Sequence, residues 1–482
     1  MEQQKFELRK VFFPNNWKEI ISMTGHIFFQ LFFVAIIAQI NMFLFTQYSG
    51  HNDEFLSLIV KATLMFTTIQ FIPSLVASGA LVVGSNLVGQ GRQAELGKVI
   101  KNGLLVNITI SLIVIIIVES SAPQLLSLLD IDNTNIGNDV HGTYYNQIDF
   151  ASSYFRLMVI QLFLMSIAQV YISGLQAIKK QKHIAIGAVV ASVLDIIYVS
   201  VVLFVFKTQP LLAALGIPVA ALFQMIYAYI IAHQLIDLKK YSFKESLDKR
   251  LISNIVKIGL PITMEIALWK FCNFSTNAAI TNLDTGGDLS QADDLTKLYL
   301  IHATILTINE FATVFLQASG TVTSILVAKK IGMDDKEGAF QAGVDGWRIA
   351  IYGQLILSLI VLGAIYPLLV FVYGRDQALV LKYGMWMYSI VFIKCLFDTV
   401  NMTLLRSLWS VGDLWTPLIV SIFTMIIGMV ALPWAINLIV KGNVGLGILL
   451  INVVVALDPI SRSIIYVKRW FSKKWFKHVK QV

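Results

Sequence analysis

Long runs of apolar residues alternate with short polar segments along almost the whole chain. Each run contains at least about 20 residues, the length that an α-helix needs to cross the hydrocarbon core of a bilayer. The pattern therefore predicts twelve transmembrane helices, at residues 20–46, 58–83, 101–122, 154–177, 184–206, 212–235, 252–280, 299–326, 348–371, 385–410, 417–440 and 446–466.

The second half of the sequence repeats the first. Residues 61–91 match residues 302–332 at an offset of 241, with Ala-Thr near the start of both segments, Ala-Ser-Gly in the middle and glycine at the end. Because six helices are an even number, two such repeats share one orientation and are related by an axis along the membrane normal. We predict an all-α polytopic membrane protein with twelve transmembrane helices in two six-helix lobes, residues 1–240 and 241–482.

Composition supports a membrane protein and sets its orientation. Hydrophobic residues make up 56% of the chain and charged residues only 14%, whereas soluble proteins have about 25% charged residues. The net charge of +8 reflects topology rather than nucleic-acid binding: alternate loops and the two ends carry 25 lysines and arginines, and the other loops carry 5. By the positive-inside rule, both termini are cytoplasmic. We expect a multi-pass protein of a bacterial plasma membrane, without a cleavable signal.

The sequence gives no support for an enzyme. It contains no His-Glu-x-x-His, Gly-x-Ser-x-Gly or Walker motif. Its seven histidines are scattered, and its two cysteines, Cys272 and Cys395, lie in apolar runs. We therefore expect neither catalytic residues nor a resident metal or cofactor.

Charged residues inside the spans are the main functional signal. Lys394 and Asp398 lie four residues apart on one face of the tenth predicted helix. A charge at the centre of a spanning helix costs roughly 2.5–3.5 kcal/mol on insertion scales, so such residues are functional candidates by default. A structural pair that only neutralises itself is the alternative.

Other polar residues form stripes on the predicted helices. Glu265 shares a face of the seventh helix with Trp269, Cys272 and Thr276. Asp458 and Arg462, four apart near a cytoplasmic end, favour a structural ion pair. Because most buried acids lie in the C-terminal half, we expect ion coupling there. The candidate cavity and ion-coupling residues are Glu265, Asp398, Lys394, Lys270, Glu310, Asn401, Asn41, Gln30, Gln70 and Asp195.

Two prolines interrupt predicted helices. Pro73 lies inside the second helix and Pro261 near the start of the seventh. A proline frees a backbone carbonyl and can bend a helix, so both are candidate hinges, with a static kink as the alternative. The acidic loop at about 123–153 is expected to be external and to hold no site. The basic C-terminal tail, with Trp470 and Trp475, is expected to lie on the anionic inner leaflet as a topology anchor.

These residues resemble the multidrug and toxin extrusion (MATE) family of the multidrug/oligosaccharidyl-lipid/polysaccharide exporter superfamily. The similarity covers nearly the whole chain and is carried by Gly259-Leu260-Pro261 with Glu265, by residues 83–91, and by the segment 397–417 that includes Asp398, Arg406 and Pro417. The resemblance implies a two-lobed exporter of organic cations that exchanges them for protons or sodium. It also implies a C-lobe cation site with acids that match Glu265 and Asp398.

Two departures from the family pattern bear on the ion. The family often has an aspartate late in helix 1, where this chain has Asn41, and a tyrosine one turn before the helix 10 acid, where it has Lys394. A lysine ammonium in the place of sodium beside Asp398 argues against sodium, and for protons or for no cation coupling at this site. We expect protonation of Glu265 or Asp398 to change its bond with Lys394 or Lys270 and to move helix 7 near Pro261.

Three alternatives stay open at this point. A flippase of a lipid-linked or anionic substrate would use the lysines as anion contacts. A receptor or scaffold would bind without transport, and an intramembrane enzyme would need a constellation that the sequence lacks. For the exporter, we expect a monomer in contact with membrane lipid whose substrate is a small organic cation.

Overall fold

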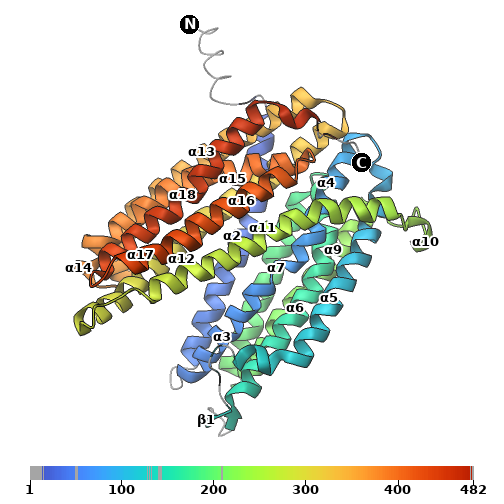
Figure 1. Ribbon diagram of the computed structural model, residues 1–482. Helices are drawn as coiled ribbons and strands as arrows, with labels where there is room; N and C mark the ends of the chain where they lie inside the picture. Colours follow the sequence, from blue (N-terminus) through green and yellow to red (C-terminus); the bar gives the residue numbers. More distant parts are fainter. Residues whose placement is uncertain are drawn as a thin grey trace. The chain divides into compact units, whose positions relative to one another are not determined.

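The computed structural model describes residues 14, 16–48, 53–127, 129, 131, 133–138, 144–207, 210–477 and 479, and these are nearly all helical (Figure 1). The α-helices of the first part of the chain are α2 (Trp17–Tyr48), α3 (Asp53–Ile69), α4 (Ile72–Gly89), α5 (Leu96–Ser127), α6 (Gln147–Ala177), α7 (Gln181–Ser200), α8 (Pro210–Ala214), α9 (Gly216–Leu235), α10 (Phe243–Ser246) and α11 (Lys249–Thr281). Those of the second part are α12 (Leu289–Gly332), α13 (Lys336–Pro367), α14 (Gln377–Leu379), α15 (Met385–Ser410), α16 (Trp415–Met425), α17 (Leu432–Ile439) and α18 (Val444–Phe471).

Short 3-10 and π-helical segments extend or join these helices. The 3-10 segments are η1 (Gln93–Glu95) and η6 (Lys474–Lys477), and the π-helical segments are η2 (Val201–Val205), η3 (Leu368–Val372), η4 (Val380–Gly384) and η5 (Ile426–Ala431). Strands β1 (Asn135–Asn138) and β2 (Tyr144–Asn146) form a small antiparallel pair before α6.

Within the described chain, twelve helical segments are long and apolar enough to cross a membrane. This confirms the twelve predicted spans, although their ends differ by several residues. The outward-facing surfaces of these helices are apolar, as contact with lipid requires; Ile116 of α5 and Ile360 of α13 are 67% and 62% exposed.

Backbone contacts divide the chain into two units, which we call the N-lobe and the C-lobe. The N-lobe is Phe29–Thr263, and the C-lobe contains the residues up to Phe28 and those from Met264 onward. The predicted boundary at residue 240 lies in the connection between α9 and α11, whereas the contacts divide α11 itself. The first part of α11 belongs to the N-lobe because Leu251 and Ile255 pack into the same core as Val76 and Val83 of α4.

Close packing of backbones joins α4 to α11 within the N-lobe. A Cβ atom on Gly259 would overlap the carbonyl oxygen of Leu75, and one on Gly79 would overlap the carbonyl oxygen of Ile255. Glycine at both positions therefore lets the two helices approach closely. Elsewhere in this lobe, α6 packs against α3, α4, α5 and α9.

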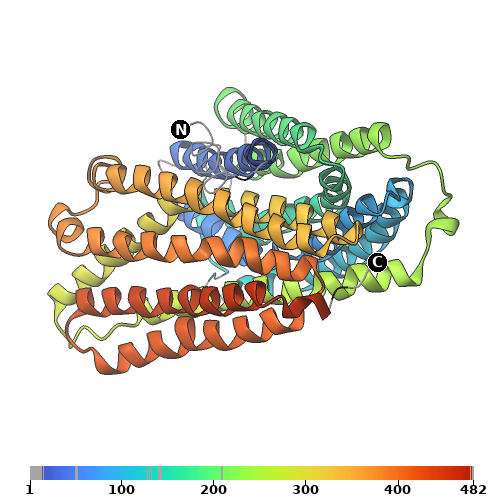
Figure 2. The same cartoon turned by 90° about the horizontal axis from the view of Figure 1, so that it is seen from above.

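The C-lobe is a bundle in which α15 packs against α12, α13 and α18. Its orange and red helices run alongside one another in both views (Figure 2). A core of aliphatic side chains with Tyr388 and Met387 fills one end of this bundle. A smaller core around Cys272, Met425 and Met429 joins α11 to α16 and η5.

The repeated second and eighth helices differ in continuity. The second span is two helices, α3 and α4, with Gln70 and Phe71 between them and Pro73 at the start of α4. At the offset of 241, the residue that corresponds to Pro73 is Val314. It lies inside α12, which is one uninterrupted helix of 44 residues. A proline is tolerated in the first turn of a helix, whereas in the interior it removes a hydrogen bond and kinks or breaks the helix, so its place at the start of α4 agrees with the break before that helix.

The C-terminal segment packs on its own lobe rather than on lipid. Trp470 stacks on Trp475 and on Phe340, and both tryptophans are fully buried. Arg469 pairs with Asp413, and Lys473 pairs with Glu337. The two tryptophan side chains are therefore covered by protein, and the contact of the basic tail with the inner leaflet stays a prediction. Much of the predicted acidic loop, including Asp130, Asp132, Asp139 and His141, lies outside the described residues.

Candidate functional site

A buried charge network at the centre of the C-lobe links α11 to α18. Arg462 donates from Nη1 to Oε1 of Glu265 at 3.0 Å and from Nη2 to Oδ2 of Asp458 at 2.7 Å. None of the three residues is more than 5% exposed. Arginine suits this bridge because its planar fork presents two terminal nitrogens at once. The sequence predicted the Asp458–Arg462 pair, but the third member, Glu265, is 197 residues from Arg462.

Neutral groups of α16 and α18 hold Glu265 in place. The Ser421 hydroxyl donates to Oε1 of Glu265 at 2.9 Å and lies 2.8 Å from the Tyr466 hydroxyl. Tyr466 in turn donates to the carbonyl of Pro417 at 3.0 Å. Sequence reasoning missed Ser421 and Tyr466, because a single hydroxyl in an apolar helix gives no signal of a partner on another helix.

Segment η5 closes this network from the side of Asp458. A Cβ atom on Gly428 would lie 3.0 Å from the Cβ atom of Asp458, a tight contact that a side chain there would have to relieve by a small shift of the neighbouring residue. Thr276 lies on the same predicted polar stripe of α11 as Glu265, and its hydroxyl donates to the carbonyl of Met429, in η5, at 2.6 Å. The stripe of Glu265, Cys272 and Thr276 thus packs against α16, η5 and α18.

A second charge pair lies on α15. Lys394 Nζ is 3.8 Å from Oδ2 of Asp398, and both side chains are partly exposed. The Asn401 amide donates to Oδ1 of Asp398 at 3.1 Å and lies 3.4 Å from the carbonyl of Pro459 on α18. Since Pro459 is next to Asp458 in the chain, Asn401 connects the two charge clusters of the C-lobe.

Lys270 and Glu310 are not part of the buried network. Glu310 is exposed on α12, and Lys270 is partly buried on α11, with its ammonium 5.6 Å from the centre of the Trp269 ring. The two side chains interact through their charges, without a contact within 4 Å. Glu265 therefore pairs with Arg462 and not with Lys270 or Lys394, which corrects the expected partners.

Arg406 completes the charged set of the C-lobe. Its Nη1 donates to the Thr321 hydroxyl at 2.6 Å and to the carbonyl of Gln317 at 3.2 Å, and no carboxylate of the described residues lies within 4 Å of it. Among the described residues, Glu265 and Asp458 thus share Arg462 and Asp398 lies beside Lys394, whereas Arg406 has no acid within 4 Å.

The buried acid of the N-lobe, Asp195, has a neutral hydrogen-bond partner and not a cation among the described residues. Asp195 of α7 is 7% exposed, and its Oδ2 accepts a 2.5 Å hydrogen bond from the Asn41 amide of α2. Its other oxygen, Oδ1, has no hydrogen-bond partner in the described structure. Gly216 of α9 packs against this oxygen, since a Cβ there would lie 2.7 Å from it. No cation of the described residues lies within 4 Å of Asp195.

The remaining candidates are dispersed. Gln30 of α2 is buried with its amide oxygen unpaired, whereas Gln70 is exposed at the break between α3 and α4. Pro261 is buried inside α11, two residues after Gly259. Among the described side chains of the N-lobe candidates, only Asn41 and Asp195 hydrogen-bond to each other.

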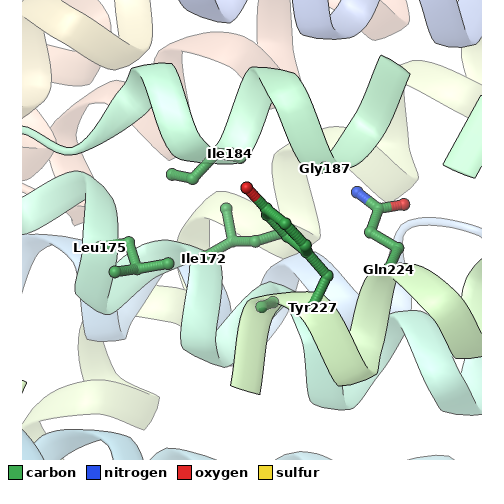
Figure 3. Close-up of a pocket in the computed structure, with 7 residues that line it drawn as sticks. Ile172, Leu175, Ile184, Gly187, Gln224 and Tyr227 are labelled. Atoms are coloured by element: carbon green, nitrogen blue, oxygen red, sulfur yellow. The ribbon is translucent and has the colours of Figure 1, made fainter. Parts of the chain in front are cut away.

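A small cavity lies elsewhere in the N-lobe, between α6, α7 and α9 (Figure 3). The Tyr227 ring points across it toward Ile184 and Gly187, with Ile172 and Leu175 on the other side. Its volume of about 10 Å³ is near the minimum for a single water molecule, so it is not a substrate site. In the described residues, no group of three or more His, Cys, Asp or Glu is arranged to hold a metal ion.

Comparisons with known proteins agree with this architecture. A family model named MatE matches residues 26–201 and 301–434, more than half of the chain. A search of curated proteins finds no match. Among solved structures, a multidrug resistance MATE family transporter of the MOP superfamily in an outward-facing conformation is similar at 14% identity and a TM-score of 0.77, over 95% of this chain and 96% of the other.

Two further structures show the same fold at low identity. The eukaryotic MATE transporter AtDTX14 is 15% identical with a TM-score of 0.77, and the alignment covers 96% of each chain. A MOP superfamily transporter from Pyrococcus furiosus is 14% identical with a TM-score of 0.75, over 96% of this chain and 98% of the other; its description reads "reverse polarity of binding pocket suggests different function".

Proposed function

Since the chain belongs to the MatE family, whose members are ion-coupled membrane transporters and not enzymes, we propose that it exports organic cations in exchange for protons. The export would proceed by alternating access of the two lobes in a plasma membrane, with both termini cytoplasmic. The coupled ion and the substrate are the parts that this proposal adds to the family assignment.

The proposal that the coupling ion is a proton rests on the surroundings of Asp195, which has no cation within 4 Å among the described residues. Its carboxyl is buried within a membrane span, and the neutral Asn41 amide is its only hydrogen-bond partner among the described residues. Protonation of Asp195 breaks no ion pair. By contrast, Glu265 and Asp458 are bonded to Arg462 and Asp398 lies beside Lys394, so protonation of any of these three acids weakens an ion pair.

This proposal moves ion coupling away from the C-terminal half, where the count of acids in the sequence placed it. The count treated each acid as free, but Glu265 and Asp458 share Arg462, and Asp398 has Lys394. Pro73 and Pro261 remain proposed hinges. Support for Pro73 comes from the break between α3 and α4 that precedes it.

The test is flux of a fluorescent organic cation into inverted vesicles under an imposed proton or sodium gradient. We expect uptake that follows the proton gradient, is lost in Asp195→Asn and is independent of sodium. Asp345→Asn is the matched control, because Asp345 is equally buried and also accepts from an amide, that of Gln341 at 2.8 Å, but has Arg348 at 3.9 Å. Full proton-driven flux in Asp195→Asn would refute the proposal.

Arg406 and Lys394 favour one alternative function, the flipping of a lipid-linked or anionic substrate. The Arg406 guanidinium bonds only neutral groups among the described residues, which leaves its charge available to an anion. If the vesicles show no cation flux under either gradient, transfer of a fluorescent anionic lipid that is lost in Arg406→Gln would favour this function.

A further inference from the structure

The three buried charges of the C-lobe form a bridge that one cation holds together. Glu265 of α11 and Asp458 of α18 each contribute one oxygen to Arg462, at 3.0 Å and 2.7 Å. Two carboxylates that meet in a dry interior repel each other unless a cation lies between them. In this lobe that cation is part of the chain.

The bridge leaves oxygen atoms that have no protein partner. Oε2 of Glu265 and Oδ1 of Asp458 are buried without a hydrogen bond among the described residues, and so is Nε of Arg462. Without the guanidinium, the space would be lined by two carboxylates and the Ser421 hydroxyl. Carboxylate and hydroxyl oxygens are ligands that hard cations such as sodium prefer.

We infer that Arg462 is a resident cation: it occupies the place between Glu265 and Asp458 that a soluble monovalent cation would take, and so closes the C-lobe to sodium. The inference deepens the proposed function, on which it rests for the idea that the chain exchanges a cation. It adds that a cation site in the C-lobe exists but is filled by a side chain, which leaves the N-lobe to exchange the proton.

The geometry also limits what could replace Arg462. Its two bonds come from two different terminal nitrogens, so the space between the carboxylates fits a planar, forked cation. Lysine, with a single ammonium, would hold the two carboxylates less well. Guanidinium supplied from solution has the shape and the donors of the lost group.

The experiment measures cation binding by the purified full-length protein in detergent, without any gradient. Arg462→Ala is heated in choline chloride and again after replacement by guanidinium chloride or sodium chloride at equal, millimolar concentration. In choline chloride, we expect the midpoint temperature of thermal unfolding of the variant to be lower than that of wild type. Guanidinium should raise it by several degrees and sodium by less, because a ligand that binds only the folded state stabilises that state. Wild type is expected to show no response to either ion.

Arg406→Ala is the matched control, since it removes a partly buried arginine whose partners are neutral. Its midpoint is expected to be the same in all three salts. A triple variant, Glu265→Gln with Asp458→Asn and Arg462→Met, removes both carboxylates with the cation and is expected to fold without a response to cations.

Either of two results would overturn the inference. One is an Arg462→Ala midpoint that guanidinium and sodium leave unchanged. The other, which needs only wild type and Glu265→Gln, is a sodium-dependent midpoint of wild type that disappears in the variant. Because no transport is measured, a failure of proton-driven flux in the vesicle experiment is a separate outcome.

Discussion

The N-lobe and the C-lobe share one sequence pattern, and they handle charge in the membrane in opposite ways. In the C-lobe, two acids on different helices share Arg462, and a third pairs with Lys394. In the described part of the N-lobe, Asp195 has a single partner, the neutral Asn41. A cluster that is cross-linked by ion pairs favours rigidity, whereas an acid without a counter-ion can gain and lose a proton without breaking a salt bridge. The difference is the basis on which we propose that the N-lobe couples the ion.

The largest expected effect tests the difference between the second and eighth helices. Val314→Pro places in the C-lobe the residue that the N-lobe has at Pro73. We expect a loss of about 3 kcal/mol or more in the free energy of unfolding, because the proline removes a hydrogen bond within α12 and clashes with the preceding turn. Denaturation in detergent measures it.

The reverse change, Pro73→Val, sharpens the same comparison. Pro73 is in the first turn of α4, where its missing N–H has no intrahelical acceptor. We therefore expect its replacement to change stability by less than about 1 kcal/mol. Similar costs for the two substitutions would show that tertiary contacts, and not the proline, separate α3 from α4.

A smaller effect is expected when each buried acid loses a neutral donor. Asn41→Ala leaves Asp195 with no hydrogen bond among those that the structure shows, so we expect a cost of about 1–3 kcal/mol. Ser421→Ala leaves Glu265 with Arg462, so its cost is expected to be about 0.5–1.5 kcal/mol. Unfolding of both variants at neutral pH makes the comparison, and a larger cost for Ser421→Ala would contradict it.

The smallest effect is expected from a substitution of Asp335, which lies in the connection between α12 and α13, a position where the two lobes differ. Asp335 begins α13, accepts from the Gly338 amide and pairs with Lys330 at 2.8 Å, whereas the N-lobe has Ala94 at this offset. The Lys330 ammonium, and next the Gly338 amide, hold the pKa of Asp335 below its ordinary value of 3.8. A lowered pKa in the folded state means that the stabilisation is present above the ordinary value and is lost as the pH falls through the folded one.

Asp335→Asn keeps an acceptor for the helix start and removes the charge. We expect it to destabilise by about 0.2–1 kcal/mol at neutral pH, as is typical of exposed ion pairs. The gap between the variant and wild type should close as the pH falls below about 4. A gap that widens on acidification would contradict the assigned cause.

The sequence could predict the helices but not the pairing of the buried charges. Apolar runs and the offset of 241 gave twelve spans in two lobes, since both features are local or periodic. The spacing of Asp458 and Arg462 showed one ion pair, because residues four apart share a helix face. That Arg462 also reaches Glu265 depends on how α11 packs against α18, which no spacing within a helix reveals.

Contacts between helices also explain why the structure, unlike the sequence, draws attention to Asp195. Composition shows how many acids each half contains, and the C-terminal half contains more. Only contacts across helices show that those acids have cations beside them and that Asp195 has none among the described residues. A count of acids therefore does not show which acids have a cation partner and which do not.

The most direct test follows the carboxyl groups themselves by infrared difference spectroscopy of the purified protein between acidic and alkaline pH. A protonated carboxyl in a dry site gives a distinct C=O band that disappears on ionisation. We predict one such band that is absent in Asp195→Asn and retained in Glu265→Gln and Asp458→Asn. A band that persists in Asp195→Asn and is lost in Glu265→Gln would contradict the account and return proton exchange to the C-lobe.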